Sequence, residues 1–253
     1  IMQSVSNKEG IMIKTIIKKS NEEINTEAFQ IMKEVVTSKQ NPVLGLATGS
    51  SPVGLYKKMI EDHETNGTSY KNCVTFNLDE YVGLPKDHEQ SYYTFMHTNL
   101  FNAIDVPEEN IHIPDGTAAD EEKACKDYEA EMKKYTVDIQ VLGIGSDGHI
   151  AFNEPGTPFT EETHLMDLTE QTRRDNARFF DGDINQVPTK AITQGLASIM
   201  RAKKIILIAT GANKAAAVYG MIKGPKTTDC PASILQDHPD VTVLMDEAAA
   251  AKL

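Results

Sequence analysis

Residues 43–60 have the sequence VLGLATGSSPVGLYKKMI, in which a short apolar run leads through small residues into a helical pattern. Residues 43–47 are almost continuously apolar, without the alternation typical of a strand that has one face in water. This predicts a buried strand, followed by a loop and a helix whose first turn accommodates Pro52. Strand, loop and helix in this order are typical of an α/β protein.

The rest of the chain repeats this alternation. Further apolar runs of strand length lie at residues 11–17, 74–78, 139–144, 205–209 and 241–245. Amphipathic patterns predict helices over residues 21–38, 91–101, 120–134, 190–200 and 213–222. We therefore predict a doubly wound, Rossmann-like α/β fold, with a mostly parallel sheet and helices on both faces.

One domain is expected over residues 11–253, because no repeat, low-complexity tract or Gly/Ser-rich linker interrupts the alternation. The chain opens at Ile1, and we interpret residues 1–10 as an N-terminal extension, native or added, outside this domain. The apolar run at residues 11–17 contains Lys14 and is too short to span a membrane.

Composition narrows the possible partners. The 253 residues are 40% hydrophobic and 25% charged, which is ordinary for a globular protein. With 25 basic and 37 acidic residues the formal net charge is −12, which argues against general binding to nucleic acid or to an anionic membrane. The cysteines Cys73, Cys125 and Cys230 are too far apart in sequence for a C-x-x-C motif, so we expect neither disulfides nor a thiolate zinc site, and a cytoplasmic location.

Two strand ends predict an anion site. The first is the loop Thr48, Gly49, Ser50 and Ser51 before a helix, although an ordinary capped turn explains it equally well. The second is Lys214, which follows a strand and opposes the dipole of the helix that begins there, as a cation would beside a bound anion.

A nearby arginine is a further candidate for the same anion. Arg178 offers a bidentate guanidinium, but an arginine on a solvated helix is also common.

Two other strand ends carry groups that can move protons. Asp79 follows the run at residues 74–78, where a carboxylate is either a general base or a turn cap. Asp147, His149 and Glu154 follow the run at residues 139–144, and Asp147 can orient the imidazole. A solvated surface loop and a metal site are the alternatives. Because a second histidine at ligand spacing is missing, we favour proton transfer over a metal.

Three motifs resemble those of the glucosamine-6-phosphate deaminase (glucosamine-6-phosphate isomerase) family. They are LATGSSP at residues 46–52, FNLDEYVGL at residues 76–84 and GIGSDGHIAFNEPG at residues 143–156. The resemblance continues through residues 173–180 and 211–214 and covers essentially the whole chain from residue 11. The third motif is long and chemically specific.

The resemblance implies conversion of glucosamine 6-phosphate and water to fructose 6-phosphate and ammonium in amino-sugar catabolism, with no cofactor and no metal. By the same likeness, His149 opens the sugar ring with the support of Asp147 and Glu154, and Asp79 removes the proton from carbon 2. The phosphate would be held by Arg178, Lys214 and the loop of residues 48–51. The expected partner is the small amino-sugar phosphate alone, bound by a monomer or small homo-oligomer.

Alternatives remain open from the sequence. A galactosamine-6-phosphate deaminase would share nearly all of this chemistry, whereas a sugar-phosphate lactonase needs no base at carbon 2. A sugar-phosphate-sensing domain of a transcription regulator is disfavoured, because no helix-turn-helix segment is evident.

Regulation is not expected. Regulated hexameric members of the resembled family carry basic residues after the Glu-Pro motif and a longer C-terminal tail. This chain has His164 and Met166 there and stops at Leu253, so we expect no activation by N-acetylglucosamine 6-phosphate.

Overall fold

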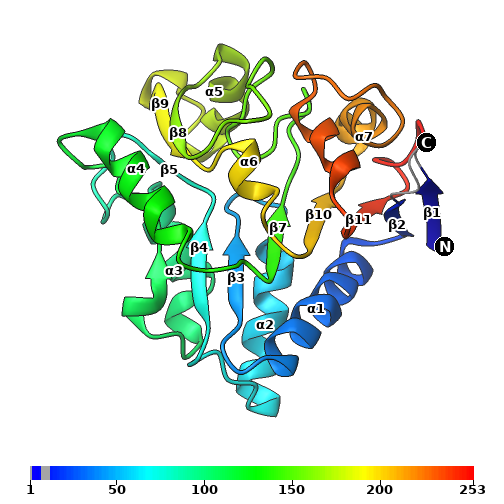
Figure 1. Ribbon diagram of the computed structural model, residues 1–253, viewed down its shortest axis with the longest axis horizontal. Helices are drawn as coiled ribbons and strands as arrows, with labels where there is room; N and C mark the ends of the chain where they lie inside the picture. The colour runs from blue at the N-terminus through cyan, green and yellow to red at the C-terminus, as the bar shows by residue number, and fades with distance from the viewer. Residues whose placement is uncertain (1, 7–11) are drawn as a thin grey trace.

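The computed structural model describes residues 2–6 and 12–253 (Figure 1). Within them, one sheet of eight strands has the order β1-β2-β11-β10-β7-β3-β4-β6. Its strands are β1 (Met2–Ser6), β2 (Met12–Lys18), β3 (Val43–Leu46), β4 (Val74–Asn77), β6 (Ile111–His112), β7 (Ile139–Leu142), β10 (Ile205–Ala209) and β11 (Val241–Asp246). All neighbouring pairs are parallel except β1 with β2. The predicted single-domain α/β fold with a mostly parallel sheet is therefore confirmed.

The strand order reverses direction between β3 and β7. From β3 the chain adds β4 and β6 on one side, and it then returns to place β7 on the other side of β3. In sheets of this kind a ligand binds beyond the carboxyl ends of the strands at such a switch point. The arrowheads of β3 and β7, which point upward near the middle of Figure 1, mark these ends.

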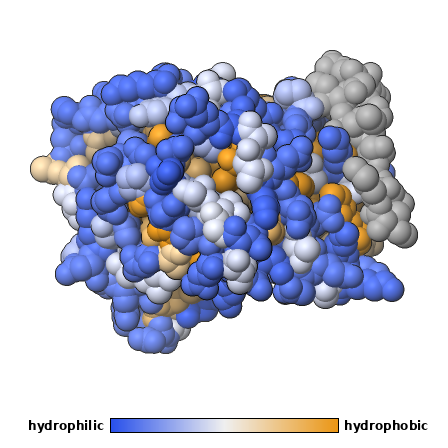
Figure 2. Space-filling view, turned by 90° about the horizontal axis from the view of Figure 1, so that it is seen from below, coloured by the Kyte–Doolittle hydropathy of each residue, from blue (hydrophilic) through white to orange (hydrophobic). Residues whose placement is uncertain are grey.

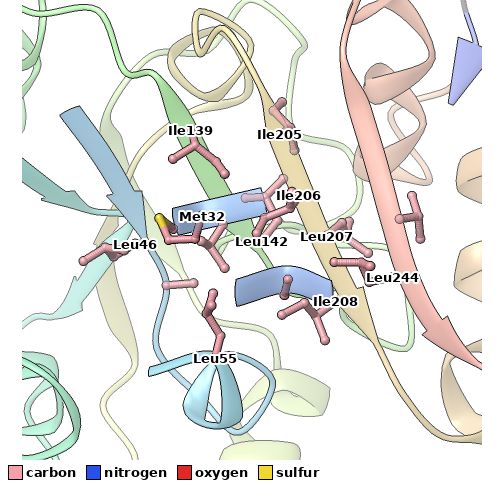
Figure 3. Close-up of a cluster of buried hydrophobic side chains, with 14 of the residues drawn as sticks. Met32, Leu46, Leu55, Ile139, Leu142, Ile205, Ile206, Leu207, Ile208 and Leu244 are labelled. Atoms are coloured by element: carbon pink, nitrogen blue, oxygen red, sulfur yellow. The ribbon is translucent and has the colours of Figure 1, made fainter. Parts of the chain in front are cut away.

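Helices cover both faces of the sheet. On one face lie α1 (Asn21–Ser38), which begins with a capping box of Ser20 and Glu23, and α2 (Val53–Asn66). Figure 3 shows Met32 of α1 and Leu55 of α2 beside Leu46 of β3.

On the opposite face, α4 (Glu121–Met132) packs Tyr128 and Met132 against Val43 and Phe76. Val43 and Leu46 are an odd number of positions apart in β3, so their side chains face opposite sides of the sheet.

The remaining helical segments are α3 (Tyr92–Asn99), η1 (Phe101–Ala103), η2 (Glu108–Asn110), α5 (Glu170–Asn176), η3 (Ala177–Phe179), η4 (Ile184–Gln186), α6 (Leu196–Ile199), η5 (Ala212–Lys214), α7 (Ala215–Ile222) and η6 (Pro231–Asp237).

A second, antiparallel sheet joins β5 (Asp79–Tyr81), β9 (Lys190–Thr193) and β8 (His164–Asp167), with β9 in the middle. The predicted helix over residues 190–200 is therefore wrong. Its first four residues form β9, because pairing on both sides and the β-branched Ile192 and Thr193 outweigh the amphipathic pattern. The helical part that remains is α6, which begins after Gly195.

The sheet also extends into the segment interpreted as an extension. Met2–Ser6 pairs antiparallel with β2, with Val5 opposite Ile13. Residues 1 and 7–11 lie outside the described residues, so the strand predicted at residues 11–17 is described from Met12 onward, as β2.

The surface viewed in Figure 2 is mainly hydrophilic, with hydrophobic residues in small separate groups. None of the helices in the described part of the chain is both long and apolar enough to cross a membrane.

Candidate active site

Asp79 lies at the point where the chain leaves the main sheet for the second one. Strand β4 ends at Asn77, and β5 begins with Asp79, which is only 6% exposed. Burial, together with the adjacent Glu80 carboxylate, raises the pKa of Asp79 to about 8. A carboxylate with a raised pKa is a stronger base than an ordinary carboxylate once it has lost its proton.

The Glu80 carboxylate has a different task. It accepts hydrogen bonds from the backbone N–H groups of Tyr81 (2.8 Å), Tyr92 (2.9 Å) and Tyr93 (2.9 Å). Tyr92 is the first residue of α3, so Glu80 fixes the N-terminus of that helix. Burial raises the pKa of Glu80, although these three hydrogen bonds oppose the shift.

The loop after β7 brings three ionisable groups together. His149 Nδ1 lies 2.7 Å from Asp147 Oδ1 and 3.8 Å from Glu154 Oε2. The turn depends on Gly148, whose φ of 89° is in the left-handed region. Burial alone would raise the pKa of Asp147, but hydrogen bonding and attraction from His149 lower it to about 2. Asp147 therefore stays ionised beside the imidazole.

Glu154 supports the same ring from a buried position, with 4% of the residue exposed. Its Oε1 accepts from the N–H and Oγ1 of Thr169 at 3.3 Å, whereas Oε2 has no hydrogen-bond partner among the described residues. Sequence reasoning missed Thr169, which lies 15 positions farther along the chain.

The same triplet is the place to consider a metal ion. One atom from each of Asp147, His149 and Glu154 lies within 4.8 Å of the others. An ion bound there would separate Asp147 from His149, and the set supplies one imidazole only. Proton transfer accounts for the close Asp147–His149 contact without further ligands.

The predicted anion loop, residues 48–51, follows β3. Tyr56 stabilises the start of this loop, because its hydroxyl donates to the carbonyl of Ala47 (2.5 Å) and accepts from the Ala47 N–H (3.1 Å). Gly49 has φ of 84°, a conformation that favours glycine and lets the backbone approach a ligand.

Two cations belong to the same region. Lys214 is half-buried, and burial lowers its pKa, while the charge of Asp175 opposes this shift. Arg178 is exposed, and its guanidinium lies over the Phe179 ring at 4.7 Å.

A cavity of about 390 Å³ at the carboxyl edge of the sheet joins these groups. Its lining includes Asp79, His149, Arg178, Lys214 and the loop of residues 48–51. Asp147 and Glu154 are not part of the lining and contact His149 instead. The structure thus brings all ten predicted site residues together, eight around the cavity and two beside the imidazole.

The sequence analysis did not identify the aromatic residues that line the cavity. Tyr81 packs edge-on against Phe180, with ring centroids 5.8 Å apart, and Tyr92 stacks on Phe152 at 6.1 Å. The hydroxyl of Tyr81 accepts from Asn176 Nδ2 at 2.9 Å, which connects β5 to α5. Tyr81 could have been found, because alternation in a strand places it on the same face as Asp79.

Comparison with known proteins decides the family. Residues 18–244 match the family described as glucosamine-6-phosphate isomerases/6-phosphogluconolactonase. The chain belongs to this family. It is 50% identical over 240 residues to glucosamine-6-phosphate deaminase from Thermoanaerobacter pseudethanolicus, with 94% of each chain covered. It is 51% identical over 241 residues to that from Streptococcus thermophilus, covering 95% of this chain and 100% of the relative.

Two solved structures have the same fold as this chain. A monomeric glucosamine-6-phosphate deaminase superposes with a TM-score of 0.92 at 43% identity, covering 94% of this chain and 99% of the other. The 6-phosphogluconolactonase of Trypanosoma brucei superposes with a TM-score of 0.80 at 20% identity, covering 96% and 99%. At that identity the second likeness shows a common fold only.

Proposed function

We propose that this protein converts glucosamine 6-phosphate and water to fructose 6-phosphate and ammonium. The observation that carries the proposal is one cavity in which a buried carboxylate, a carboxylate-supported imidazole and an anion-binding loop face the same space. The deaminases at about 50% identity support the same reaction.

Ring opening is assigned to His149. The imidazole takes the proton from the carbon 1 hydroxyl and returns one to the ring oxygen as the bond between carbon 1 and that oxygen breaks. Asp147, held ionised, orients the ring and stabilises its protonated form, and the unpaired oxygen of Glu154 lies near the same ring nitrogen and adds to this stabilisation.

Isomerisation is assigned to Asp79. In the open-chain sugar its carboxylate removes the carbon 2 proton, and the electron pair forms the double bond of an enolamine as the aldehyde accepts a proton. Reprotonation at carbon 1 gives an imine at carbon 2. Water adds to this imine, and loss of ammonia leaves the ketose.

Phosphate binding is assigned to the loop of residues 48–51 with Lys214 and Arg178. The free N–H groups before α2 suit an anion, and the half-buried ammonium of Lys214 gains a partner when phosphate binds. This local positive site opposes the formal charge of −12 carried by the chain.

The test is an assay of purified protein for ammonium and fructose 6-phosphate. We expect one of each per glucosamine 6-phosphate consumed, without added metal or cofactor. Galactosamine 6-phosphate and 6-phosphogluconolactone serve as the two comparison substrates. Hydrolysis of the lactone without ammonium release from either amino sugar would contradict the proposal.

We also propose a cytoplasmic monomer whose partner is the sugar phosphate alone. The solved deaminase with a TM-score of 0.92 is described as monomeric. The large hydrophobic residues exposed in the described structure are four scattered ones: Tyr135, Phe179, Tyr219 and Leu253. The three cysteines are free, as suits a reducing compartment. Light scattering should give a mass near 27.9 kDa, and a multiple of it would contradict the monomer.

A further inference from the structure

The two proton-moving groups of the cavity lie on separate segments, which a short stretch at the end of β9 connects. Asp79 begins β5, whereas His149 and Glu154 flank the turn of residues 150–153. Thr193 of β9 pairs with Asp79 in the second sheet. The residue after it, Gln194, is 1% exposed and is not one of the residues that line the cavity.

Gln194 is bonded to the base-bearing segment twice. Its backbone N–H donates to the carbonyl of Leu78 at 2.7 Å, and its side-chain Nε2 donates to the carbonyl of Asn77 at 3.1 Å. These are the two carbonyls that precede Asp79 in the chain. The bonds therefore fix the direction in which the backbone enters Asp79.

The same residue is also bonded to the imidazole loop. The Gln194 carbonyl accepts from Asn153 Nδ2 at 2.9 Å, and this nitrogen also donates to the carbonyl of Ile150 at 3.0 Å. The neighbouring Thr193 Oγ1 accepts from the N–H of Phe152 at 3.1 Å. The second half of the turn, at Phe152 and Asn153, is thus held against residues 193–194, and Asn153 connects it to the first residue, Ile150.

The bridge is shielded from water and closely packed. Thr193 and Asn153 are 0% exposed, so their hydrogen bonds have no competition from bulk water. At the next residue, Gly195, a Cβ would come within 2.2 Å of the carbonyl oxygens of Glu161 and Glu162, so its backbone packs directly against that segment.

We propose that Gln194 is a positioning residue, which sets the placement of Asp79 relative to the His149 loop without touching the substrate. The inference rests on the proposed function, since it assumes that both groups act on one sugar. A displacement of about 1 Å between reacting groups costs on the order of 100-fold in rate. The phosphate site, at residues 48–51 and Lys214, has no bond to Gln194.

The test compares Gln194→Met with Gln140→Met. The substitution in Gln194 removes the amide donor at similar side-chain length and leaves the backbone bonds in place. Gln140 is the matched control, because it is also 1% exposed and donates Nε2 to a backbone carbonyl, that of Val141 at 2.9 Å, away from both proton-moving segments. Each variant is assayed with glucosamine 6-phosphate carrying hydrogen or deuterium at carbon 2, per amount of folded protein.

For Gln194→Met we expect kcat to fall about 100-fold while KM stays within about threefold, because substrate binding is untouched. The deuterium isotope effect on kcat should increase, since removal of the carbon 2 proton becomes the slow step. Gln140→Met should keep kcat within about threefold of wild type with an unchanged isotope effect. A loss of stability alone would not raise the isotope effect.

Three outcomes would overturn the inference. One is a kcat for Gln194→Met equal to that of Gln140→Met, and another is a lower kcat with an unchanged isotope effect. If Gln194→Met does not fold, Gln194→Asn replaces it, since the shorter amide no longer reaches Asn77. If both Gln194 variants fail to fold while Gln140→Met folds, Gln194 is needed for folding and its role as a positioning residue is contradicted. A wild-type protein that releases no ammonium would instead disprove the proposed function.

Discussion

Asp79 combines two properties that conflict with each other in a folded protein. It is buried beside the like charge of Glu80, which favours proton abstraction but makes its ionised form costly to hold. The pKa of about 8 in the fold compares with 3.8 for the free group. Between these values the folded protein keeps a proton that the unfolded chain releases, so this group lowers stability as pH rises through that window.

We expect Asp79→Asn to raise the free energy of unfolding at pH 7, because asparagine folds without the proton uptake that Asp79 needs at this pH. The gain should be roughly 1 to 3 kcal/mol and should shrink as pH falls toward 4. Urea unfolding at several pH values measures it. Asp87→Asn, at an exposed position, is the control and should change stability by less than about 0.5 kcal/mol. A variant less stable than wild type at pH 7 would contradict this view of Asp79.

Glu80 permits a test of the pH dependence. Its charge contributes to the raised pKa of Asp79, so Glu80→Gln should lower that pKa. The base is active when ionised, and the acidic limb of kcat/KM against pH should therefore move to lower pH. Glutamine keeps one oxygen for the N–H groups of α3. Glu89→Gln, at an exposed position, should leave the limb in place. A limb that stays or moves upward in Glu80→Gln would exclude Asp79 as the titrating base.

At the scale of elements, the site is made by the loops that follow β3, β4, β7 and β10. The ends of these strands could be predicted from the sequence, because each is a continuous apolar run followed by small or charged residues. The segments of Asp79 and His149 were located in this way.

The second sheet could not be predicted in the same way. Its strand β9 has no apolar run longer than Ala191–Ile192, and its pairing with β5 and β8 joins residues about 110 and 25 positions apart. The aromatic lining and the Gln194 bridge depend on that pairing. For this reason they became visible only in the structure.

The junction of η5 and α7 supplies a prediction about phosphate. Lys214→Ala should lower kcat/KM for glucosamine 6-phosphate by an amount equivalent to roughly 2 to 5 kcal/mol, because it removes the half-buried ammonium proposed to pair with the phosphate. Arg178→Ala should cost less, since Arg178 is exposed. Lys223→Ala, an exposed lysine at the other end of α7, should have no effect.

The contrast with the unphosphorylated sugar identifies the phosphate ligand. Glucosamine should be handled equally poorly by wild type and by Lys214→Ala. If Lys214→Ala prefers the phosphorylated sugar as strongly as wild type does, Lys214 does not bind phosphate.

At the scale of the molecule, Glu129 of α4 ties the second sheet to the main one. Its Oε2 accepts from Thr163 Oγ1 at 2.6 Å and from Ser198 Oγ at 2.8 Å, and its Oε1 pairs with Arg201. Glu129→Ala should lower the free energy of unfolding by roughly 2 to 4 kcal/mol, because these donors lose a buried acceptor. The control Lys126→Ala, at an exposed position of the same helix, should cost less than about 1 kcal/mol in urea unfolding. Equal losses would show that the Glu129 network does not hold the sheets together.

Regulation is the other property of the whole molecule. His164 and Met166 lie in β8, where His164 Nδ1 is 2.7 Å from the carbonyl of Glu162. Neither side chain supplies the fixed cation that an anionic effector needs, and an effector acts only by binding two states differently. We predict hyperbolic kinetics that N-acetylglucosamine 6-phosphate alters only by weak competition. Sigmoidal kinetics made hyperbolic by that sugar would contradict this.

The most direct test of the proposed reaction follows the hydrogen on carbon 2. Glucosamine 6-phosphate deuterated at carbon 2 is incubated with wild type and with Asp79→Asn, and loss of the label to water or to carbon 1 is measured by NMR. We predict that wild type removes the deuterium as ammonium is released. Asp79→Asn should still bind the sugar but remove the label about 100 to 10,000 times more slowly, which is the usual contribution of a positioned base. Removal of the label by Asp79→Asn at the wild-type rate would show that Asp79 is not the base.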